Sequence, residues 1–383
     1  MGFSSWRTTT DAAGLRFVST GEEPDDDFIR GHPDLFSSRW NGLASFRVLL
    51  DRLIAPSLEP TCAALLNEVD RHDVLVAHHF VLPAPVVAEL KGIPFATVCL
   101  APCVTPSAYG SPGGDYARVG EGIGFRLRNR FVWAAGRRII AGMVDPLVND
   151  LRLKHGLAPV PDATFAVRSP RLDLQLYSEH FAPRPPDWGA EKKYGGFCFY
   201  DPPGAWTLAP EIEEFLSQGE SPVLFTLGST VVRSPGSFYE EAVKALEALG
   251  LRGILLIGSE ENRPVRLPDT ILAATYAPYG LLMPRVRAVA HQCGIGTLSH
   301  TLRARVPSVA CPFAFDQPNN ARRLESLGVA ETILPHQRTA RHLEEALRRL
   351  LAGEASARAC RLGEIIRAED GVGKACAALE EAF

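Results

Sequence analysis

The chain has 383 residues, of which 46% are hydrophobic and 22% are charged, and its formal net charge is -4. A chain of this length and composition can bury two cores of ordinary size, so we expect a globular protein of two domains. The mildly acidic balance and the lack of a basic, aromatic binding motif argue against a nucleic-acid partner.

The start of the chain and the cysteines indicate a cytoplasmic protein. The opening MGFSSWRTTTDAAGL lacks the apolar core of a signal peptide, and no apolar run approaches the length of a membrane span. Among the eight cysteines there is no CxxC pair, and Cys99, Cys198 and Cys311 lie in apolar runs that are typical of buried thiols. We therefore expect neither a disulfide nor a structural zinc.

The first half of the chain predicts a small parallel sheet. Strands are expected at residues 74–77 and 95–100, with a helix in PAPVVAELKG between them. A long helix follows at residues 122–155, and a last strand is expected at 195–199. The passage from 183 to 210 is rich in proline and glycine, which is typical of a domain boundary.

The second half alternates strand and helix more regularly. It predicts a strand at residues 223–227, a helix at 237–249 and a strand at 253–257. Helices are expected from 339 to the end, with a terminal one at 370–383. This alternation is typical of a doubly wound α/β sheet.

Two successive strand–loop–helix units lie between the strand at 253–257 and the helices that begin at 339. A strand at residues 286–290 leads into HQCGIGT, which opens a helix that ends near residue 305. Gly294 and Gly296 would let the backbone approach a ligand, and the N–H groups of the first helical turn would favour an anion. The Thr297 hydroxyl and a side chain from His291 or Gln292 can add hydrogen bonds to a phosphate.

The second unit places polar groups beside the first. A strand at residues 308–313 is followed by a loop at 314–320 and by a helix that ends at Gly328. Loops that follow parallel strands emerge at one edge of the sheet. Asp316 and Gln317 should therefore lie near the loop at residues 291–297, which we call the phosphate loop. A carboxylate and an amide suit the hydroxyls of a sugar. In the alternative interpretation Asp316 only caps the helix and the glycines only make turns.

Taken together, the motifs of this region form one ordered series. They are Tyr276-Ala277-Pro278, the run from His291 to Thr297, Leu302-Arg303-Ala304, Pro312-Phe313 and the run from Asp316 to Ala321. The series resembles the donor-binding signature of the family-1 glycosyltransferases, in particular the bacterial branch that glycosylates natural products and lipids. Further similarity lies near residues 13–18, 196–201 and 225–229. Cys293 and Arg305 stand where the family has glycine, so an altered phosphate loop is one expectation.

The resemblance implies a GT-B architecture, in which two Rossmann-like, doubly wound domains face each other across a cleft. Residues 1–200 would form the acceptor-binding domain and residues 201–369 the nucleotide-sugar donor domain. The helix at 370–383 would cross back to the first domain. No cofactor or metal is implied beyond the nucleotide sugar itself.

The resemblance also implies a role for each residue of the donor site. Ser229 and Thr297 would contact the diphosphate, with His291 or Gln292 beside it. Asp316 and Gln317 would bind the sugar hydroxyls. The remaining candidates are aromatic or amide side chains: Tyr276 and Tyr279 would pack near the nucleobase and ribose, or serve as core aromatics, and Asn320 would bind the donor or cap its helix.

The catalytic base is the least certain element of the sequence. In the family a strand, a glycine-containing loop and a helix precede AAGLRFV, and that loop often carries the base histidine. Here AAGLRFV starts at residue 12, so we expect this first unit to be missing. His78 and His79 follow the strand at 74–77 and are the candidate catalytic residues. The alternative is that they are hydrogen-bonded loop histidines.

Two further patterns have a structural and a functional interpretation. Asp25-Asp26-Asp27 has the spacing of a metal-binding DxD, but we interpret it as a solvated acidic loop. The arginines and aromatics between residues 125 and 138 would form an amphipathic helix with its charged face in water. Contact of that helix with a membrane or with an apolar acceptor is the alternative.

The sequence thus predicts a hexosyltransferase. We expect it to move a hexose from a UDP- or dTDP-sugar, with inversion and without a metal, to a hydroxyl of an apolar small molecule or lipid. One alternative is an inactive nucleotide-sugar-binding protein or a fragment that needs a partner chain. Another is a non-transferring relative of the same fold, such as a sugar-nucleotide epimerase.

Overall fold

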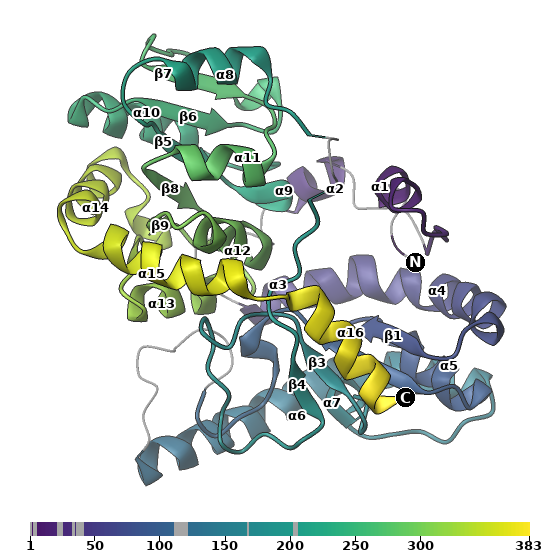
Figure 1. Cartoon of the computed structure of the whole chain (residues 1–383). Helices are drawn as coiled ribbons and strands as arrows, with labels where there is room; N and C mark the ends of the chain where they lie inside the picture. The colour runs from purple at the N-terminus through teal and green to yellow at the C-terminus, as the bar shows by residue number, and fades with distance from the viewer. Residues whose placement is uncertain are drawn as a thin grey trace. The chain divides into compact units, whose positions relative to one another are not determined.

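The computed structural model describes residues 2, 6–20, 26–32, 35, 42–110, 122–166, 168–201 and 206–383. Asp25 and the side chains of Asp26 and Asp27 lie outside the described part, so the acidic run is not considered further. The chain divides into two compact units, each with its own parallel sheet (Figure 1). Unit 1 comprises Met1–Phe28, Leu43–Phe199 and Asp370–Phe383, and unit 2 comprises Ile29–Gly42 and Tyr200–Glu369.

The sheet of unit 1 has the strand order β1-β2-β3-β4, with all described pairs parallel. Its strands are β1 (Leu75–His78), β2 (Phe95–Cys99), β3 (Asp173–Gln175) and β4 (Lys192–Tyr194). The first two confirm the predicted strands. The strand predicted at residues 195–199 is wrong, because β4 ends at Tyr194. Gly196 takes a φ of 90°, which turns the chain out of the extended conformation.

The described helices of unit 1 are α1 (Arg7–Ala12), α3 (Gly42–Leu49), a π-helical segment (Leu50–Ile54), α4 (Ala55–Glu68), α5 (Pro83–Lys91), α6 (Ile123–Lys154), α7 (Ala163–Ala166) and α16 (Gly371–Ala382), with 3₁₀ turns at Val69–Arg71 and Pro102–Val104. Helix α2 (Asp26–Gly31) spans the boundary between the two units. The predicted long and terminal helices are confirmed by α6 and α16. The main core forms where α4, α5 and the C-terminal half of α6 pack together, around Leu65, Val87 and Val148.

Helix α16 packs against strands β2 and β3 of this sheet. Ala375 and Ala378 contact a buried cluster that includes Ala96 and Leu174. A Cβ atom at Gly371 would lie 2.1 Å from the carbonyl oxygen of Phe197, so only glycine fits where α16 begins. Cys198, next to this contact, is exposed, whereas Cys99 and Cys311 are buried. The prediction for Cys198 was wrong because Phe197 takes the inward position and turns its neighbour outward.

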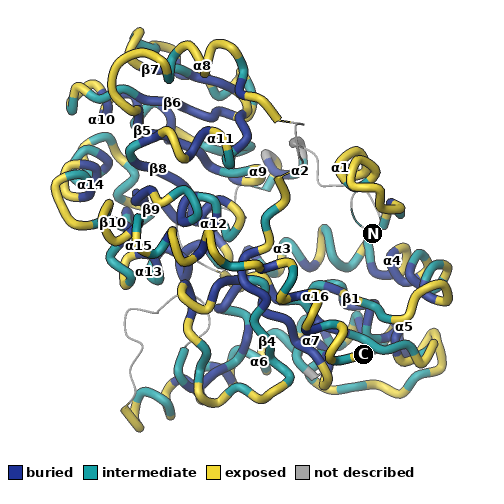
Figure 2. The backbone as a smooth tube through the Cα atoms, viewed as in Figure 1, coloured by how far each residue is buried: buried dark blue, intermediate teal, exposed yellow. Residues whose placement is uncertain are grey.

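The sheet of unit 2 has the strand order β10-β9-β8-β5-β6-β7, again with all pairs parallel. Its strands are β5 (Val223–Thr226), β6 (Gly253–Leu256), β7 (Ile271–Ala274), β8 (Ala288–His291), β9 (Ser308–Ala310) and β10 (Ala330–Thr332). Every residue of β5, β6 and β8 is buried (Figure 2), as expected for a sheet covered on both faces. The predicted doubly wound sheet is confirmed.

The helices of unit 2 precede, connect and follow these strands. They are α8 (Pro210–Ser217), α9 (Gly228–Val231), α10 (Phe238–Leu249), α11 (Tyr279–Leu282), α12 (Ile295–Arg303), α13 (Gln317–Ser326), α14 (Ala340–Ala352) and α15 (Ala355–Ala368), with 3₁₀ turns at Glu260–Asn262, Met283–Arg285 and Pro335–Gln337. Several predicted boundaries were wrong: His291 ends strand β8, strand β9 ends at Ala310 and not at residue 313, and Gln317 begins helix α13. Pro318 sits in the first turn of α13, where it needs no N–H partner.

No helix among the described residues is both long enough and apolar enough to cross a membrane.

Candidate functional site

The order of strands reverses between β5 and β8. From β5 the chain proceeds through β6 and β7 to one edge of the sheet, and from β8 through β9 and β10 to the other. The loops that leave β5 and β8 therefore diverge and open a crevice at the carboxyl end of the strands, which is where ligands bind in sheets of this type. Most residues predicted for the donor site lie on these two loops and on the neighbouring one after β9.

The loop after β5 approaches the loop after β8 through a glycine. Gly228 has a φ of 65°, and a Cβ atom on it would lie 2.2 Å from Nε2 of Gln292 and 3.2 Å from Oγ1 of Thr297. Any side chain there would collide with these polar groups. Ser229, the next residue, is exposed on the first turn of α9. The glycine thus permits a close approach that leaves the serine accessible.

Helix α12 begins at this crevice. Gly294 is its N-cap residue, and none of the described side chains accepts the N–H groups of its first turn. The Thr297 hydroxyl lies in that turn and accepts a hydrogen bond of 3.2 Å from Gln292 Nε2. A Cβ atom on Gly296 would meet nothing within 4 Å. The helix start therefore offers free donors, partial positive charge and open space, which together suit an anion.

His291 does not face this space. It is fully buried, Nδ1 accepts a hydrogen bond of 3.1 Å from the backbone N–H of Cys293, and Nε2 lies 3.1 Å from Oγ of Ser308. Burial lowers the pKa of the imidazole to about 3, so the ring is neutral, and Nε2 carries the proton that Ser308 accepts. Of the two predicted alternatives, Gln292 contacts Thr297 at the start of α12, whereas His291 accepts a hydrogen bond from the backbone of Cys293.

Both residues that replace a glycine of the family motif keep the backbone that glycine would adopt. Cys293 has a φ of 67° and Arg305 a φ of 65°, and few described residues other than glycine share this region. A side chain in this conformation costs about 1–2 kcal/mol. The buried Cys293 therefore preserves the turn of the phosphate loop at some cost in stability.

The loop after β9 joins this loop through an amide. Nδ2 of Asn320, a buried residue, donates hydrogen bonds to the carbonyl oxygen of Cys293 at 2.9 Å and to Oδ2 of Asp316 at 2.7 Å. Asn320 thus clamps the carboxylate to the phosphate loop. The sequence had suggested donor binding or helix capping for Asn320, and its 27-residue separation from Cys293 gave no local signal for this bridge.

Asp316 and Gln317 occupy the start of α13. Burial raises the pKa of Asp316 to about 6, and the hydrogen bond from Asn320 partly opposes that shift. The carboxylate is therefore mostly ionised at neutral pH. Gln317 Oε1 accepts hydrogen bonds from the backbone N–H groups of Phe313 and Ala314 at 2.8 and 3.0 Å, which orients its amide nitrogen away from that loop.

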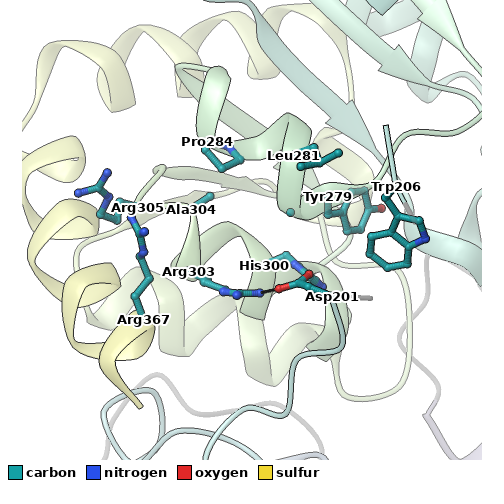
Figure 3. Close-up of a pocket in the computed structure, with 11 residues that line it drawn as sticks. Asp201, Trp206, Tyr279, Leu281, Pro284, His300, Arg303, Ala304, Arg305 and Arg367 are labelled. Carbon is teal, nitrogen blue, oxygen red and sulfur yellow. Dashed lines mark hydrogen bonds and ion pairs between the residues drawn. The ribbon is translucent and has the colours of Figure 1, made fainter. Parts of the chain in front are cut away.

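The two predicted tyrosines differ in their surroundings. Tyr276 is 66% exposed, whereas the Tyr279 hydroxyl lies 2.8 Å from Oγ1 of Thr226 at the end of β5. The ring of Tyr279 lines a pocket of about 400 Å³ between α11 and α12, together with Trp206 and His300 (Figure 3). An ion pair between Arg303 and Asp201 closes one side of this pocket. Tyr279 thus lines the pocket with its ring and contacts the end of β5 with its hydroxyl group.

The candidate base residues lie in unit 1. His78 ends β1, and its ring centroid is 4.1 Å from that of His79. Burial, and then the charge of Arg168, lowers the pKa of His78 to about 4. Burial, then His78 and then Arg168 lower the pKa of His79 well below its usual value. Both rings are neutral at neutral pH. Both nitrogens of His79 are buried without a partner among the described residues, whereas His78 Nδ1 lies 3.4 Å from the N–H of Phe80.

No three His, Cys, Asp or Glu side chains come together as metal ligands in the part of the chain that the structure describes.

Comparison with known proteins places this site in a family context. Residues 252–369 match the family model described as the erythromycin biosynthesis protein CIII-like, C-terminal domain. The chain is 33% identical, over 98% of its length and 88% of the relative's, to an O-mycaminosyltylonolide 6-deoxyallosyltransferase of Streptomyces fradiae. It is 31% identical to sterol 3-beta-glucosyltransferase UGT80A2 of Arabidopsis thaliana, over 75% of this chain and 45% of that one.

Solved structures agree on the architecture. The crystal structure of the glycotransferase of kitacinnamycin superposes with a TM-score of 0.70 at 22% identity, covering 99% of this chain and 90% of that one. At this level of identity the likeness concerns the fold, which is GT-B.

Proposed function

Because the chain belongs to the family-1 glycosyltransferases of GT-B fold, enzymes that use nucleotide sugars, we propose that it moves a hexose from a UDP- or dTDP-sugar to a hydroxyl of an apolar small molecule or lipid. Unit 2 would bind the donor, and unit 1 would contribute to binding of the acceptor. The observation that carries this proposal is the Asn320 clamp, which fixes a carboxylate beside a helix start suited to a diphosphate. The names of the two relatives support an apolar hydroxyl acceptor.

The diphosphate would lie against the start of α12. Thr297, Gln292 and the free N–H groups of the first turn would donate to its oxygens, and Ser229 would donate from the loop after β5. These donors are fixed before the reaction, so they stabilise the negative charge that grows on the leaving diphosphate. We propose that the helix start fills the role that a divalent cation has in other glycosyltransferases. The nucleoside would extend toward Tyr276 and the pocket beside Tyr279.

The sugar would lie between this loop and α13. Asp316 accepts hydrogen bonds from sugar hydroxyls in its ionised form, and the amide nitrogen of Gln317 donates to them. Asn320 would act as a positioning residue, because it touches the carboxylate and the phosphate loop but is itself buried. Tight positioning of this kind aligns the anomeric carbon for attack.

We propose an inverting displacement with His78 as the base. The acceptor oxygen forms a bond to the anomeric carbon from the face opposite the diphosphate. The bond between the anomeric carbon and the diphosphate oxygen breaks, and the diphosphate leaves with the electron pair. The hydroxyl proton passes to the imidazole of His78, which is neutral in the resting protein because burial lowers its pKa to about 4. We favour His78 because both nitrogens of His79 are sealed from solvent.

The transfer proposal is tested with a panel of UDP- and dTDP-sugars and apolar alcohols, read by mass spectrometry. We expect an acceptor product heavier by one hexose, lost in Asp316→Ala and kept in Asp269→Ala, an exposed aspartate outside the site. Release of free sugar or epimer without acceptor product would contradict it. Donor binding in calorimetry without any turnover would favour an inactive binding protein instead.

The base proposal is tested separately by steady-state kinetics. Removal of a general base lowers kcat by about 10²–10⁴-fold. We expect this loss in His78→Ala, with a smaller one in His79→Ala and little change in the KM for the donor in either. Equal kcat in the wild type and in both variants would place the base on another residue.

A further inference from the structure

The N-terminal two thirds of α6 carries positive charge without any negative charge. Between Ile123 and Val144 the helix contains five arginines and no aspartate or glutamate, although the chain as a whole has a net charge of -4. The first acidic residue of the helix is Asp145. Its carboxylate accepts hydrogen bonds from the backbone N–H groups of Asp162 and Ala163, so it does not neutralise this segment.

The same segment exposes large apolar side chains. Ile123 is 69% exposed, Leu127 58% and Phe131 74%. They are four residues apart, so they lie along one face of the helix. Ile139 continues this exposed apolar surface at 48%. In the C-terminal half of α6, by contrast, Val144, Val148 and Leu151 are buried in the core of unit 1.

Arginines flank the apolar face on both sides. Seen down the helix, Arg130 lies to one side of the face formed by Ile123, Leu127 and Phe131, and Arg128 lies to the other. Arg130 and Arg138 are exposed, and neither has an ion-pair partner among the described residues. Arg126 and Arg137 are held differently, against Tyr109 and Asp162. The arginines that stay available are thus those beside the exposed apolar side chains.

We propose that this face of α6, defined by Ile123, Leu127, Phe131, Arg130 and Arg138, binds the surface of an anionic lipid bilayer. The apolar side chains would enter the boundary between headgroups and acyl chains, and the arginines would remain at the level of the lipid phosphates. Charge complementarity favours this occupant. Both arginines lack ion-pair partners among the described residues, and α6 has no carboxylate before Asp145, so the face fits a sheet of negative headgroups better than a neutral protein surface. The inference goes beyond the proposed transfer reaction and does not depend on it.

The experiment is co-sedimentation of the full chain with vesicles. Vesicles of phosphatidylcholine alone are compared with vesicles that also contain phosphatidylglycerol, at low and high salt. We expect binding to the anionic vesicles only, weakened by salt. Each arginine near such a surface contributes about fivefold to partitioning, so Arg130→Gln and Arg138→Gln should each lower it by about that factor. Phe131→Ser should lower it by about tenfold or more.

Matched substitutions on α15 serve as controls. Ile365→Ser removes another exposed apolar side chain and Arg361→Gln another exposed arginine, and neither should change vesicle binding. Equal binding of all variants, or equal binding to both kinds of vesicle, would overturn the proposal. So would a drop in oligomer size in Phe131→Ser, measured by sedimentation velocity, because the face would then be covered by a second copy of the chain. None of these outcomes bears on sugar transfer, which is assayed with dissolved acceptors.

Discussion

Replacing Asp316 by asparagine should stabilise the protein at neutral and higher pH. Burial raises the pKa of this carboxyl from 3.8 to about 6, so the folded state holds the proton more tightly than the unfolded chain. The stability that protonated Asp316 contributes is present in full below about pH 4 and is lost as the pH rises to about 6. Each pKa unit corresponds to about 1.36 kcal/mol, so ionisation costs the fold up to ~3 kcal/mol above that pH.

Asparagine removes this cost. It carries no charge, and its carbonyl oxygen can still accept the hydrogen bond that Asn320 now donates to Asp316. Asp316→Asn should therefore match the wild type near pH 4 and exceed its free energy of unfolding by up to ~3 kcal/mol near pH 8. Transferase activity should nevertheless be lost, because the amide cannot replace a carboxylate that accepts from two sugar hydroxyls. The fold would thus gain stability from the loss of a functional charge.

The assay is urea unfolding of wild type and variant across this pH range. Asp269→Asn, at an exposed position, is the control and should show no gain that grows with pH. If Asp316→Asn is less stable than the wild type near pH 8, the carboxylate is stabilised by the fold and the reasoning from burial fails. A difference that does not vary with pH would also refute it, because it could not come from ionisation.

Three further substitutions test the site. Asn320→Leu keeps the approximate shape of the side chain but removes both hydrogen bonds from Nδ2, so the pKa of Asp316 should rise above about 6. The acid limb of the pH profile of kcat/KM should then move to higher pH, and an unchanged limb would contradict the role given to Asn320. Gly228→Ala should weaken donor binding in calorimetry by about tenfold or more, because its Cβ would lie 2.2 Å from Nε2 of Gln292; unchanged affinity would show that the two loops need not approach. Cys293→Gly should change the free energy of unfolding by less than about 1 kcal/mol, because relief of the left-handed backbone strain offsets the loss of a buried thiol. Donor affinity should stay unchanged, and a large loss of affinity would show that the thiol itself contributes to donor binding.

Most of unit 2 could be read from the sequence. Each element predicted from residue 223 onward is present with boundaries shifted by a few residues, whereas the short strands β7 and β10 were not predicted. Unit 1 was predicted less well, because its short strands carry weaker patterns. The strand expected at residues 195–199 failed since the turn at Gly196 depends on a backbone angle that composition does not reveal.

The sequence named candidate residues for the site but not their surroundings. His291 and Gln292 were equivalent candidates in sequence, and only the contact with Ser308, on another strand, shows that the His291 ring is buried in the sheet. Asn320 was a marginal candidate until its contact with Cys293 became visible. The exposed face of α6 was expected to be its charged face in water, and large apolar side chains share it.

By itself, then, the sequence determined the local parts: a glycine loop that opens a helix, a carboxylate and amide that follow the next strand, and a charge pattern along one long helix. These are local because a helix start presents its free N–H groups whatever surrounds it. The tertiary structure alone decided which parts meet. The pairing of β5 with β8 joins residues more than 60 positions apart, and it brings Gly228 against Gln292 and opens the crevice. Burial, which depends on that packing, set the pKa of Asp316 and the neutral state of the histidines.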